Sequence, residues 1–526
     1  MMTGLVSVKE ASKWASEYSE KNITESNISY LIQYGRINRY NQEGNTLVEI
    51  ADVKQYYNSL KGQKELDWKE KLGADLNWTL SFDSYKESET TKHIHRLHPY
   101  KGKFIPQLAE YFLDNHTDSF KKEIYFQEGD IILDPFCGSG TTLVQACELG
   151  MNAIGVDISK FNAMISNSKV ENYDILSLQK TLNELNKNFN KFENEVDVVA
   201  FENELLSELY KFNSKYFPTP EFKKCVNNKT INEKEYSTQK EKEFLPIFHS
   251  VAKKHNIEID GQTNDSFMNK WYFSTTKKET YYISELIDKI SDEPIKRIMQ
   301  IILSRTIRSC RATTHSDLAT LVVPIYTTYY CRKHKKICKP LFSIKKWWDT
   351  YSKDTIERIK LFQKYKTKTN QYCFTGDSRN LNIEKAIEKQ FQVLLPIYKG
   401  KKIKGIFSSP PYVGLIDYHE QHAYSYELFS LKRNDNLEIG PLFNGGGIGA
   451  RNSYVEGISQ VLINCKKYLC NDYEVFLVAN DKHNLYPQIA EKASMKIIDV
   501  FKRPVLNRTE KDKGAYSEFI FRMKEK

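Results

Sequence analysis

Apolar residues form two short continuous runs in the first third of the chain. The run at 131–134 ends in an aspartate, and the run at 153–157 ends in another about twenty residues later. Such runs, separated by a helix-length segment at 141–149, indicate buried parallel strands joined by a helix. A helix is expected over 105–113, and alternating strand and helix patterns return from Tyr372 to the end. The pattern predicts a doubly wound, Rossmann-like α/β core.

Between the two halves the pattern changes. Residues 175–265 are rich in Asn, Lys and Glu with sparse apolar periodicity, whereas apolar residues from Phe267 to Arg311 recur at helical spacing. We therefore expect a large, mostly helical insertion. The predicted organisation is an N-terminal unit at 1–62, a polar linker at 63–88, one half of the core at 89–175, the insertion at 176–368, and the second half at 369–526.

The N-terminal unit has the pattern helix, helix, hairpin, helix. Ser7 and Glu10 form a capping box for a helix through Tyr18, and a second helix is expected from a Thr24 cap to Tyr34, ended by Gly35. A hairpin with a turn at 43–45 and a helix at 51–57 follow. This order resembles winged helix-turn-helix domains of the excisionase and MerR type; a small helical cap or protein-interaction module is the alternative. The resemblance implies that a DNA groove faces Ser26, Asn27, Ser29 and Tyr30 and that phosphates meet Arg36 and Arg39.

Composition restricts the class of protein. The 526 residues are 40% hydrophobic, no apolar run is long enough for a bilayer, and the first residues carry no apolar signal core. Nine scattered cysteines fit reduced thiols. We expect a multidomain, cytoplasmic protein without structural disulfides.

The net charge of +10 is concentrated in one stretch. Residues 301–350 hold ten Lys or Arg against two Asp, a net charge of +8. Basic side chains interleaved with aromatic rings suit a phosphate backbone and stacking surfaces, although a solvated basic surface is the alternative. The candidate nucleic-acid contacts here are Arg305, Arg308, Arg311, Lys333, Lys335 and Lys336, with stacking rings at Tyr329, Tyr330, Phe342, Trp347 and Trp348.

A glycine-rich turn follows the first apolar strand. Asp134-Pro-Phe-Cys-Gly138-Ser-Gly140-Thr141-Thr142 opens a helix, where glycines permit close approach of a ligand and the helix N-terminus offers unpaired amides. Asp157 ends the next strand, where a carboxylate can accept both ribose hydroxyls of a nucleoside. The turn lacks the lysine of a phosphate-binding loop, so an uncharged or cationic nucleoside is favoured over a nucleotide triphosphate. A tight turn without a ligand is the alternative.

This motif resembles the cofactor motif of the amino-methylating DNA methyltransferases. Their second signature has the form (S/N/D)-P-P-(Y/F/W), and Ser409-Pro410-Pro411-Tyr412 follows an apolar strand at 405–407. The resemblance implies S-adenosylmethionine as cofactor. It assigns cofactor contacts to Phe104, Asp134, Pro135, Phe136, Gly138, Gly140, Thr141, Thr142, Asp157 and Asp377.

The second signature suits amino-group chemistry. An exocyclic amine is a poor nucleophile because its lone pair delocalises into the ring. Acceptors at the Ser409 hydroxyl and the Pro410 carbonyl favour a pyramidal amine, Pro411 stiffens the loop, and Tyr412 stacks on the base. A base within a duplex must be flipped out to reach such a loop.

Further positions match the family less closely. Phe104 is expected over the methionine end of the cofactor and Asp377 at the adenine amino group, although a buried aromatic and a turn aspartate are the alternatives. His419 and His422 follow the proline loop in a segment that resembles a subset of the family, and we expect them at the base or the backbone. Arg503, Arg508 and Glu518 are expected to complete the sheet.

A zinc site was weighed at Cys331, His334 and Cys338, with Cys310 and His315 upstream. The paired cysteine spacings of known structural sites are absent, and the flanking lysines suit DNA. The sequence therefore predicts no metal.

These observations predict a site-specific DNA methyltransferase that favours cytosine N4, since the loop begins with serine. The resemblance implies double-stranded DNA as partner and a cognate restriction endonuclease in a restriction-modification system. The alternatives are adenine N6 methylation, a tRNA guanine N2-methyltransferase, and a non-catalytic DNA-binding regulator.

Overall fold

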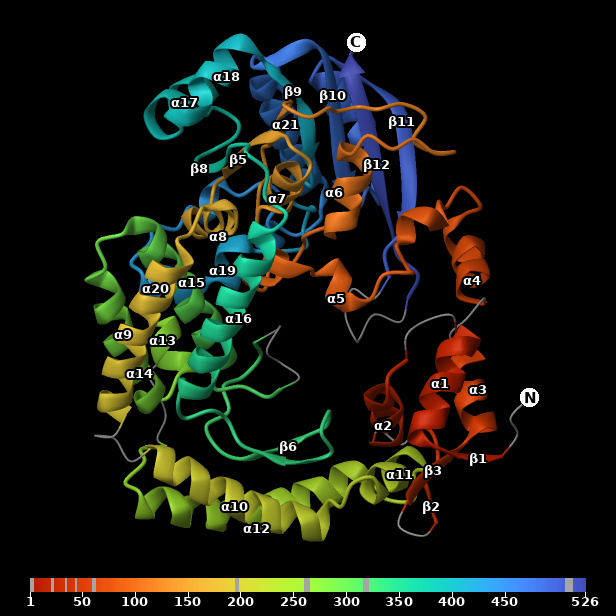
Figure 1. Ribbon diagram of the computed structural model, residues 1–526, viewed down its shortest axis with the longest axis vertical. Helices are drawn as coiled ribbons and strands as arrows, with labels where there is room; N and C mark the ends of the chain where they lie inside the picture. Colours follow the sequence, from red (N-terminus) through yellow and green to blue (C-terminus); the bar gives the residue numbers. More distant parts are fainter. Residues whose placement is uncertain are drawn as a thin grey trace.

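A seven-stranded sheet forms the centre of the computed structural model (Figure 1). The structure describes residues 4–19, 23–33, 36–42, 45–58, 63–193, 198–259, 265–315, 321–506 and 514–526. The strand order is β11-β12-β10-β9-β4-β5-β8, and β12 alone runs antiparallel to its neighbours among these described strands. The strands are β4 (Ile131–Asp134), β5 (Asn152–Asp157), β8 (Gln371–Thr375), β9 (Ile403–Ser408), β10 (Leu469–Ala479), β11 (Met495–Pro504) and β12 (Ser517–Glu525). The predicted α/β class is confirmed.

Both faces of the sheet are buried because successive apolar side chains point to opposite sides. In β4, Ile131 and Leu133 lie in one core cluster and Ile132 in another, and each is fully buried. The cluster around Ile132 includes α6 (Pro106–Leu113), α7 (Thr141–Glu148) and α8 (Lys160–Val170). The opposite cluster includes α17 (Ile383–Gln390), α18 (Leu395–Gly400), α21 (Ile448–Lys466) and α22 (Tyr486–Lys492).

The strand order reverses direction between β4 and β9. From β4 the chain continues to β5 and β8 on one side, and later returns to β9 and β10 on the other. In open α/β sheets, ligands bind in the crevice outside the carboxyl ends of the strands at such a switch point. The glycine turn after β4 and the proline loop after β9 therefore begin at the same place.

The insertion leaves the core after α8 and returns to it at β8. It comprises α9 (Ile175–Glu193), α10 (Val198–Tyr216), α11 (Glu221–Asn227), α12 (Glu233–Lys254), α13 (Phe267–Trp271), α14 (Ser274–Asp288), α15 (Glu293–Ser309), the hairpin β6 (Tyr329–Cys331) and β7 (Lys336–Cys338), and α16 (Lys345–Gln363). Lys366, just after α16, donates to the carbonyl oxygens of Val170 (2.6 Å) and Glu171 (2.9 Å), so the two ends of the insertion are tied together.

The N-terminal unit contains a three-stranded sheet of order β1-β3-β2 and three helices. Its elements are β1 (Leu5–Ser7), α1 (Val8–Ser19), α2 (Glu25–Gln33), β2 (Tyr40–Gln42), β3 (Asn45–Glu49) and α3 (Ile50–Asn58). The backbone N–H of Ser7 donates to Glu10, and that of Glu10 donates to the Ser7 hydroxyl, as the capping box predicts. Tyr34, Gly35, Glu43 and Gly44 lie outside the described residues. Winged-helix recognition of DNA stays a prediction.

Residues 63–88 were expected to form a polar linker but pack on the core. They hold α4 (Gln63–Leu72) and a 3₁₀ turn at Trp78–Ser81, followed by α5 (Glu87–Thr90). The rings of Trp68 and Trp78 meet edge to face at 6.1 Å, and the Asn77 N–H donates to the Lys502 carbonyl on β11 at 2.7 Å. Aromatic burial and this hydrogen bond fix a segment whose average composition is polar.

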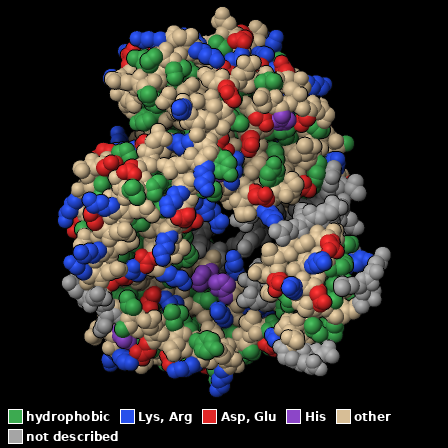
Figure 2. Space-filling model, viewed as in Figure 1, with side chains coloured by type: hydrophobic (Ala, Val, Ile, Leu, Met, Phe, Trp, Pro, Cys, Tyr) green, Lys and Arg blue, Asp and Glu red, His purple; other side chains and the backbone are tan. Residues whose placement is uncertain are grey.

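The core, the insertion and the N-terminal unit surround an opening. Figure 1 shows α10 and α12 across the base of the molecule, with the N-terminal unit and α16 on opposite sides. Figure 2 shows the same opening as a hollow at the centre of this face, with Lys and Arg side chains around it. Among the described helices, none has the length and apolar character required to span a bilayer.

Candidate functional site

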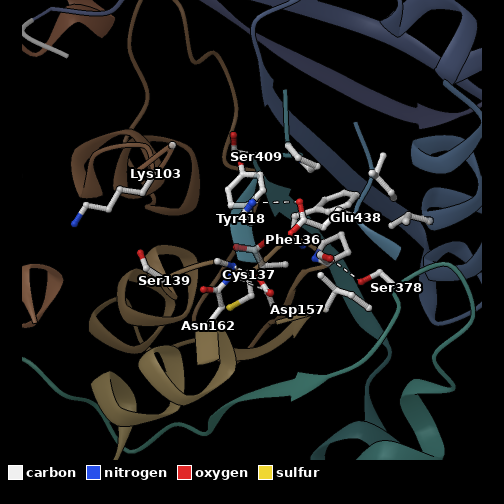
Figure 3. Close-up of a pocket in the computed structure, with 18 of the residues that line it drawn as sticks. Lys103, Phe136, Cys137, Ser139, Asp157, Asn162, Ser378, Ser409, Tyr418 and Glu438 are labelled. Carbon is white, nitrogen blue, oxygen red and sulfur yellow. Dashed lines mark hydrogen bonds between the residues drawn. The ribbon is translucent and has the colours of Figure 1, made fainter. Parts of the chain in front are cut away.

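An open pocket of about 830 Å³ lies at the switch point of the sheet (Figure 3). It is lined from one side by the turn after β4 and from the other by the loop after β9, with further residues from β5, β8 and the segment before α6. Ten of the predicted site residues line it: Phe104, Asp134, Pro135, Phe136, Gly138, Thr141, Asp157, Asp377, Ser409 and Pro411. The two sequence motifs therefore share one cavity.

Hydrogen bonds lock the two motifs together below the pocket. The Ser408 hydroxyl donates to Asp134 at 2.5 Å, and the Thr142 hydroxyl donates to the Phe407 carbonyl at 3.2 Å. Burial raises the pKa of Asp134 to about 6, against donors at the Ser408 hydroxyl and the Phe136 N–H that favour its ionised form. Thr142 is fully buried and does not line the pocket, so its role is to join the start of α7 to β9.

Asp157 sits at the end of β5 and is 9% exposed. It accepts hydrogen bonds from the backbone N–H of Gly138 (2.7 Å) and Ser159 (2.8 Å) and from the Asn162 amide (3.1 Å). Burial raises its pKa to about 6 despite these donors. The carboxylate thus holds the glycine turn in place while it also lines the pocket.

Glycine is required at positions 138 and 140 of the turn for two different reasons. Gly138 has φ +51°, and a Cβ there would approach the Tyr100 hydroxyl at 3.0 Å inside the pocket. Gly140 has φ +76°, and a Cβ would meet Ser166 on α8 at 2.9 Å. Gly140 therefore permits helix packing, and it does not line the pocket as we had expected.

Asp377 and Phe104 lie at the pocket as predicted, and each also has a structural contact. Both carboxylate oxygens of Asp377 accept from the Arg379 guanidinium, at 2.9 and 2.7 Å. Phe104 packs edge to face on Phe407 of β9, with ring centroids 5.3 Å apart. These contacts hold the two side chains in fixed positions at the wall.

The proline loop is held by the strands beside it. The Ser409 hydroxyl donates to the Val478 carbonyl of β10 at 3.0 Å. The Tyr412 hydroxyl donates to Glu518 of β12 at 2.9 Å, and Arg503 of β11 pairs with that carboxylate at 3.2 Å. Arg503 and Glu518 thus complete the sheet as expected, while Arg508 lies outside the described residues. Pro410 and Tyr412 are not among the residues that line the cavity.

Sequence reasoning missed several pocket residues. Tyr100, Ser139, Asn162, Tyr418 and Glu438 line the cavity, and Figure 3 shows Ser139 and Asn162 near Asp157, with Tyr418 beside Glu438. Tyr100 lies four residues before Phe104, which the resemblance assigned to the cofactor. Ser139 lies between the two glycines of the turn, and Tyr418 precedes His419 in the segment after the proline loop, whereas Asn162 and Glu438 carry no local signal.

His419 and His422 do not reach the pocket, which corrects their expected contact with a base. His419 is fully buried: its Nδ1 lies against Glu438, and its Nε2 accepts from the Asn434 N–H at 3.2 Å. His422 is 2% exposed, and burial lowers its pKa to about 3. Both imidazoles hold the loop that contributes Tyr418 and Glu438. This loop includes α19 (Tyr418–Gln421) and α20 (Ala423–Leu428).

Only some of the cations in residues 301–350 lie at the protein surface. Arg305 pairs with Asp354 at 2.5 Å and packs over Tyr351, while the buried Arg311 donates to the Arg308 carbonyl at 2.9 Å. Lys335 pairs with Glu233 at 2.6 Å. These three cations stabilise the fold, contrary to the expected phosphate contacts. The rings of Tyr329, Phe342 and Trp348 are also buried and offer no stacking surface.

Other cations of the predicted interface lie at the surface. Arg36 and Arg39 on the N-terminal unit are exposed, as are Lys333 and Lys336 on the β6–β7 hairpin, and Arg308 is half-buried. The two groups belong to separate parts of the molecule that both border the opening (Figures 1 and 2).

Comparisons with known proteins agree on one class of enzyme. A family model described as DNA methylase, of the N6/N4 type, matches residues 18–168. The type II methyltransferase M.MjaII of Methanocaldococcus jannaschii is 46% identical over 524 residues, covering 99% of this chain and 97% of its own. The type II methyltransferase M.MvaI of Kocuria varians is 31% identical over 116 residues, 22% of this chain and 24% of its own.

A shorter similarity reaches an RNA-modifying enzyme. The tRNA (guanine(10)-N2)-dimethyltransferase of Methanocaldococcus jannaschii is 38% identical over 72 residues, 11% of this chain and 20% of its own. The similarity that spans the whole chain is to the type II methyltransferase.

Proposed function

The chain belongs to the family of type II DNA methyltransferases of the N6/N4 type, and on this premise we propose that it methylates the N4 amino group of cytosine within a specific DNA sequence. The cofactor of this family is S-adenosylmethionine. The choice of cytosine N4 rests on the serine at the start of the Ser409–Tyr412 loop.

The shared pocket carries this proposal. One cavity is lined by Gly138 and Asp157 on the side of β4 and β5, and by Ser409 and Pro411 at the end of β9. Methyl transfer needs donor and acceptor held in contact and in line, which two loops at adjacent strand ends provide. The hydrogen bond between Ser408 and Asp134 keeps those strand ends in register.

The pocket residues fit the cofactor. The buried Ser139 Oγ, Thr141 Oγ1 and Asn162 Oδ1 have no hydrogen-bond partner among the described residues, and all three residues line the cavity. Buried polar atoms without partners are costly, so a polar ligand at this place would satisfy them. In this proposal Asp157 accepts the ribose hydroxyls, Asp377 meets the adenine amino group, and Phe104 covers the methionine end. S-adenosylmethionine supplies an electrophilic methyl group on a sulfonium sulfur.

Ser409 is oriented as an acceptor. Its hydroxyl hydrogen is directed to the Val478 carbonyl, so its oxygen lone pairs remain for an incoming amino group. The Pro410 carbonyl offers the second acceptor, and the Tyr412 ring is held by Glu518 beside them. Accepting both amino hydrogens at once favours attack by the nitrogen lone pair. The base enters this site only after it is flipped from the duplex.

The opening in the molecule suits double-stranded DNA. Figure 1 shows the N-terminal unit, which contains the exposed Arg36 and Arg39, on one side of it and β6 of the hairpin that carries the exposed Lys333 and Lys336 on another. Contacts of this kind hold phosphates, and side chains of the insertion are placed to read the bases. The biological role would be to protect host DNA from a cognate restriction endonuclease.

The decisive experiment identifies the methylated nucleoside. The full-length protein is incubated with radiolabelled S-adenosylmethionine and either double-stranded DNA or tRNA, and the products are digested and separated by mass spectrometry. We expect N4-methylcytosine from DNA. N6-methyladenine from DNA would overturn the choice of cytosine N4 and leave DNA methylation in place. N2-methylguanine from tRNA, or no transfer with DNA binding retained, would overturn the whole proposal.

Ser409→Ala tests the role of the loop. We expect at least a 10²-fold loss of turnover, with cofactor affinity changed less than about threefold, because the hydroxyl acts on the amine. Ser459→Ala is the matched control, since that buried hydroxyl donates to the Val455 carbonyl within α21 (2.7 Å). Unchanged turnover in Ser409→Ala would remove Ser409 from the reaction.

A further inference from the structure

Four potential metal ligands converge in the insertion. They are Cys331, His334 and Cys338 of the β6–β7 hairpin and His315 from the segment after α15. One ligand atom of each residue lies within 4.8 Å of all the others. The imidazole rings of His315 and His334 are 4.6 Å apart, and the His334 Nδ1 lies 3.6 Å from the Cys338 Sγ.

Two sulfur and two nitrogen donors are the ligand set of a structural zinc site. In a tetrahedral zinc site with ordinary bond lengths, the ligand atoms lie roughly 3.3 to 3.8 Å from one another. The observed cluster needs only a small contraction to reach this geometry. Two thiolates also balance the charge of Zn²⁺, so the filled site adds no net charge to a basic hairpin.

Little apolar packing surrounds the two cysteines of the hairpin. Its strands are three residues each and form a separate two-stranded sheet. Its own hydrophobic cluster consists of Tyr329, Cys331 and Cys338, with Ile325 packed against it. A two-stranded hairpin is marginally stable by itself, and here two cysteines occupy the positions that larger apolar side chains would fill.

We propose that Cys331, His334, Cys338 and His315 bind one structural zinc ion. This reverses the expectation from spacing, which looked for paired cysteines and found none. The fourth ligand comes from a different segment, so the ion would join the chain after α15 to the hairpin. The Tyr329 hydroxyl accepts from the His315 N–H (3.1 Å) and lies 2.8 Å from its Nδ1, which holds the ring beside the cluster.

The site would fix a basic turn at the edge of the opening. Arg332, Lys333 and Lys336 of the turn are exposed. Its base is anchored by Asn213 on α10, which bonds both backbone groups of Ile337, and by Glu233 on α12, which accepts from Lys335. Figure 1 shows β6 next to the opening. The use of this turn for DNA rests on the proposed function, whereas metal binding does not.

Metal analysis of the full-length protein tests the proposal directly. Protein purified without chelators should contain about one zinc ion per chain, and Co²⁺ exchanged into it should give the intense d–d and thiolate charge-transfer bands of a tetrahedral S₂N₂ site. Absence of zinc together with two fewer titratable thiols would indicate a disulfide between Cys331 and Cys338. Absence of both metal and thiol loss would leave an ordinary hydrophobic cluster, and either result overturns the proposal.

Variants locate the ion. The double variant Cys331→Ser/Cys338→Ser should lower the zinc content at least tenfold and abolish the Co²⁺ bands. Cys225→Ser, a thiol on α11 outside the cluster, should retain both. Equal zinc in the double variant and the control would place the metal elsewhere. Methyl transfer is measured in parallel: stoichiometric zinc in a protein without transferase activity would contradict the proposed function and leave the zinc site intact.

Discussion

The Ser408 hydroxyl donates to the Asp134 carboxylate at 2.5 Å, which joins the last residue of β9 to the last residue of β4. Both side chains are buried, at 0% and 2% exposure. The contact bridges two sequence motifs that lie more than two hundred residues apart. The proposed reaction depends on the positions of both loops, and this bond is where they are fixed together.

Ser408→Ala should lower both stability and turnover, because it loosens the relative positions of the two loops. Removing the donor leaves a buried carboxylate with one hydrogen bond fewer, which costs about 1–3 kcal/mol of unfolding free energy. We expect lower kcat with a smaller effect on KM for DNA. Urea unfolding and steady-state transfer assays measure the two effects, with Ser459→Ala as control. A variant with full stability and full kcat would contradict this role of the bond.

Cofactor binding should weaken in acid. Burial raises the pKa of Asp157 to about 6, and the ionised carboxylate accepts hydrogen bonds from ribose hydroxyls more strongly than the protonated form does. The affinity for S-adenosylmethionine should therefore be constant above about pH 7 and fall up to tenfold per pH unit below about pH 6. Calorimetric titration from pH 5 to pH 8 measures it; an affinity that is flat over this range would show that Asp157 does not hold the ribose.

In the protein without cofactor, the Asp157 carboxyl group should make the fold more stable in acid, which is the opposite of its effect on cofactor affinity. Its folded pKa, about 6, lies above the usual 3.8, so the folded chain holds the proton more strongly than the unfolded chain. This contribution stabilises the fold at low pH and is lost as the pH rises from about 4 to about 6. Asp157→Asn should remove this loss in urea unfolding curves and should also reduce cofactor affinity. A pH dependence identical to that of the wild type would contradict the assignment.

Arg36 and Arg39 should contribute to DNA affinity through phosphates. Replacing both with alanine should reduce the slope of log affinity against log salt by about 2, since each phosphate contact contributes about 0.9. Fluorescence anisotropy with labelled duplex over a salt series gives the slope. Lys9→Ala/Lys13→Ala on α1 removes the same charge from exposed positions. An equal change in both pairs would indicate a general charge effect without a defined contact.

Two substitutions should separate structural from interface cations in the basic stretch. Arg305→Ala removes one of the two guanidinium partners of Asp354 and leaves Arg358 at 2.8 Å, so it should cost about 1 kcal/mol of stability, with the salt slope of DNA binding unchanged. Lys333→Ala/Lys336→Ala should do the reverse. The assignment of Arg305 would be wrong if its loss reduced the salt slope while the stability stayed at the wild-type value.

Tyr412→Phe and Tyr412→Ala should distinguish the hydroxyl from the ring. The phenylalanine variant loses the bond to Glu518 but keeps the stacking surface, so turnover should fall less than about fivefold. The alanine variant loses the ring and should weaken DNA binding by about 1–3 kcal/mol, which would appear as a higher KM for DNA. Equal effects of the two substitutions would mean that Tyr412 serves only to anchor the loop.

Local signals predicted the core well. The strand at 131–134 and the helix from Thr141 were read within a residue because an apolar run, a glycine turn and a helix start lie in adjacent positions. Gly138 and Asp157 were placed at the pocket for the same reason. Such features depend on nearby residues, and a sequence shows these directly.

Features that depend on distant residues were missed. Arg305 was counted as a surface cation because Asp354, which buries it, lies 49 positions away. His419 was expected at the base, but Glu438 holds it inside the loop. The four-ligand cluster was rejected because its cysteines lack the usual paired spacing, and only the fold brings His315 next to the hairpin. In each case the partner, and not the residue itself, determines the role.

The insertion begins and ends at one point, where Lys366 bonds the carbonyls of Val170 and Glu171. With its two termini clamped together, a segment of almost two hundred residues imposes almost no geometric demand on the strands that flank it. Under the proposed function, the parts of the insertion that lie away from the core can therefore be lengthened, shortened or exchanged, and recognition of new DNA sequences can evolve while the sheet is preserved.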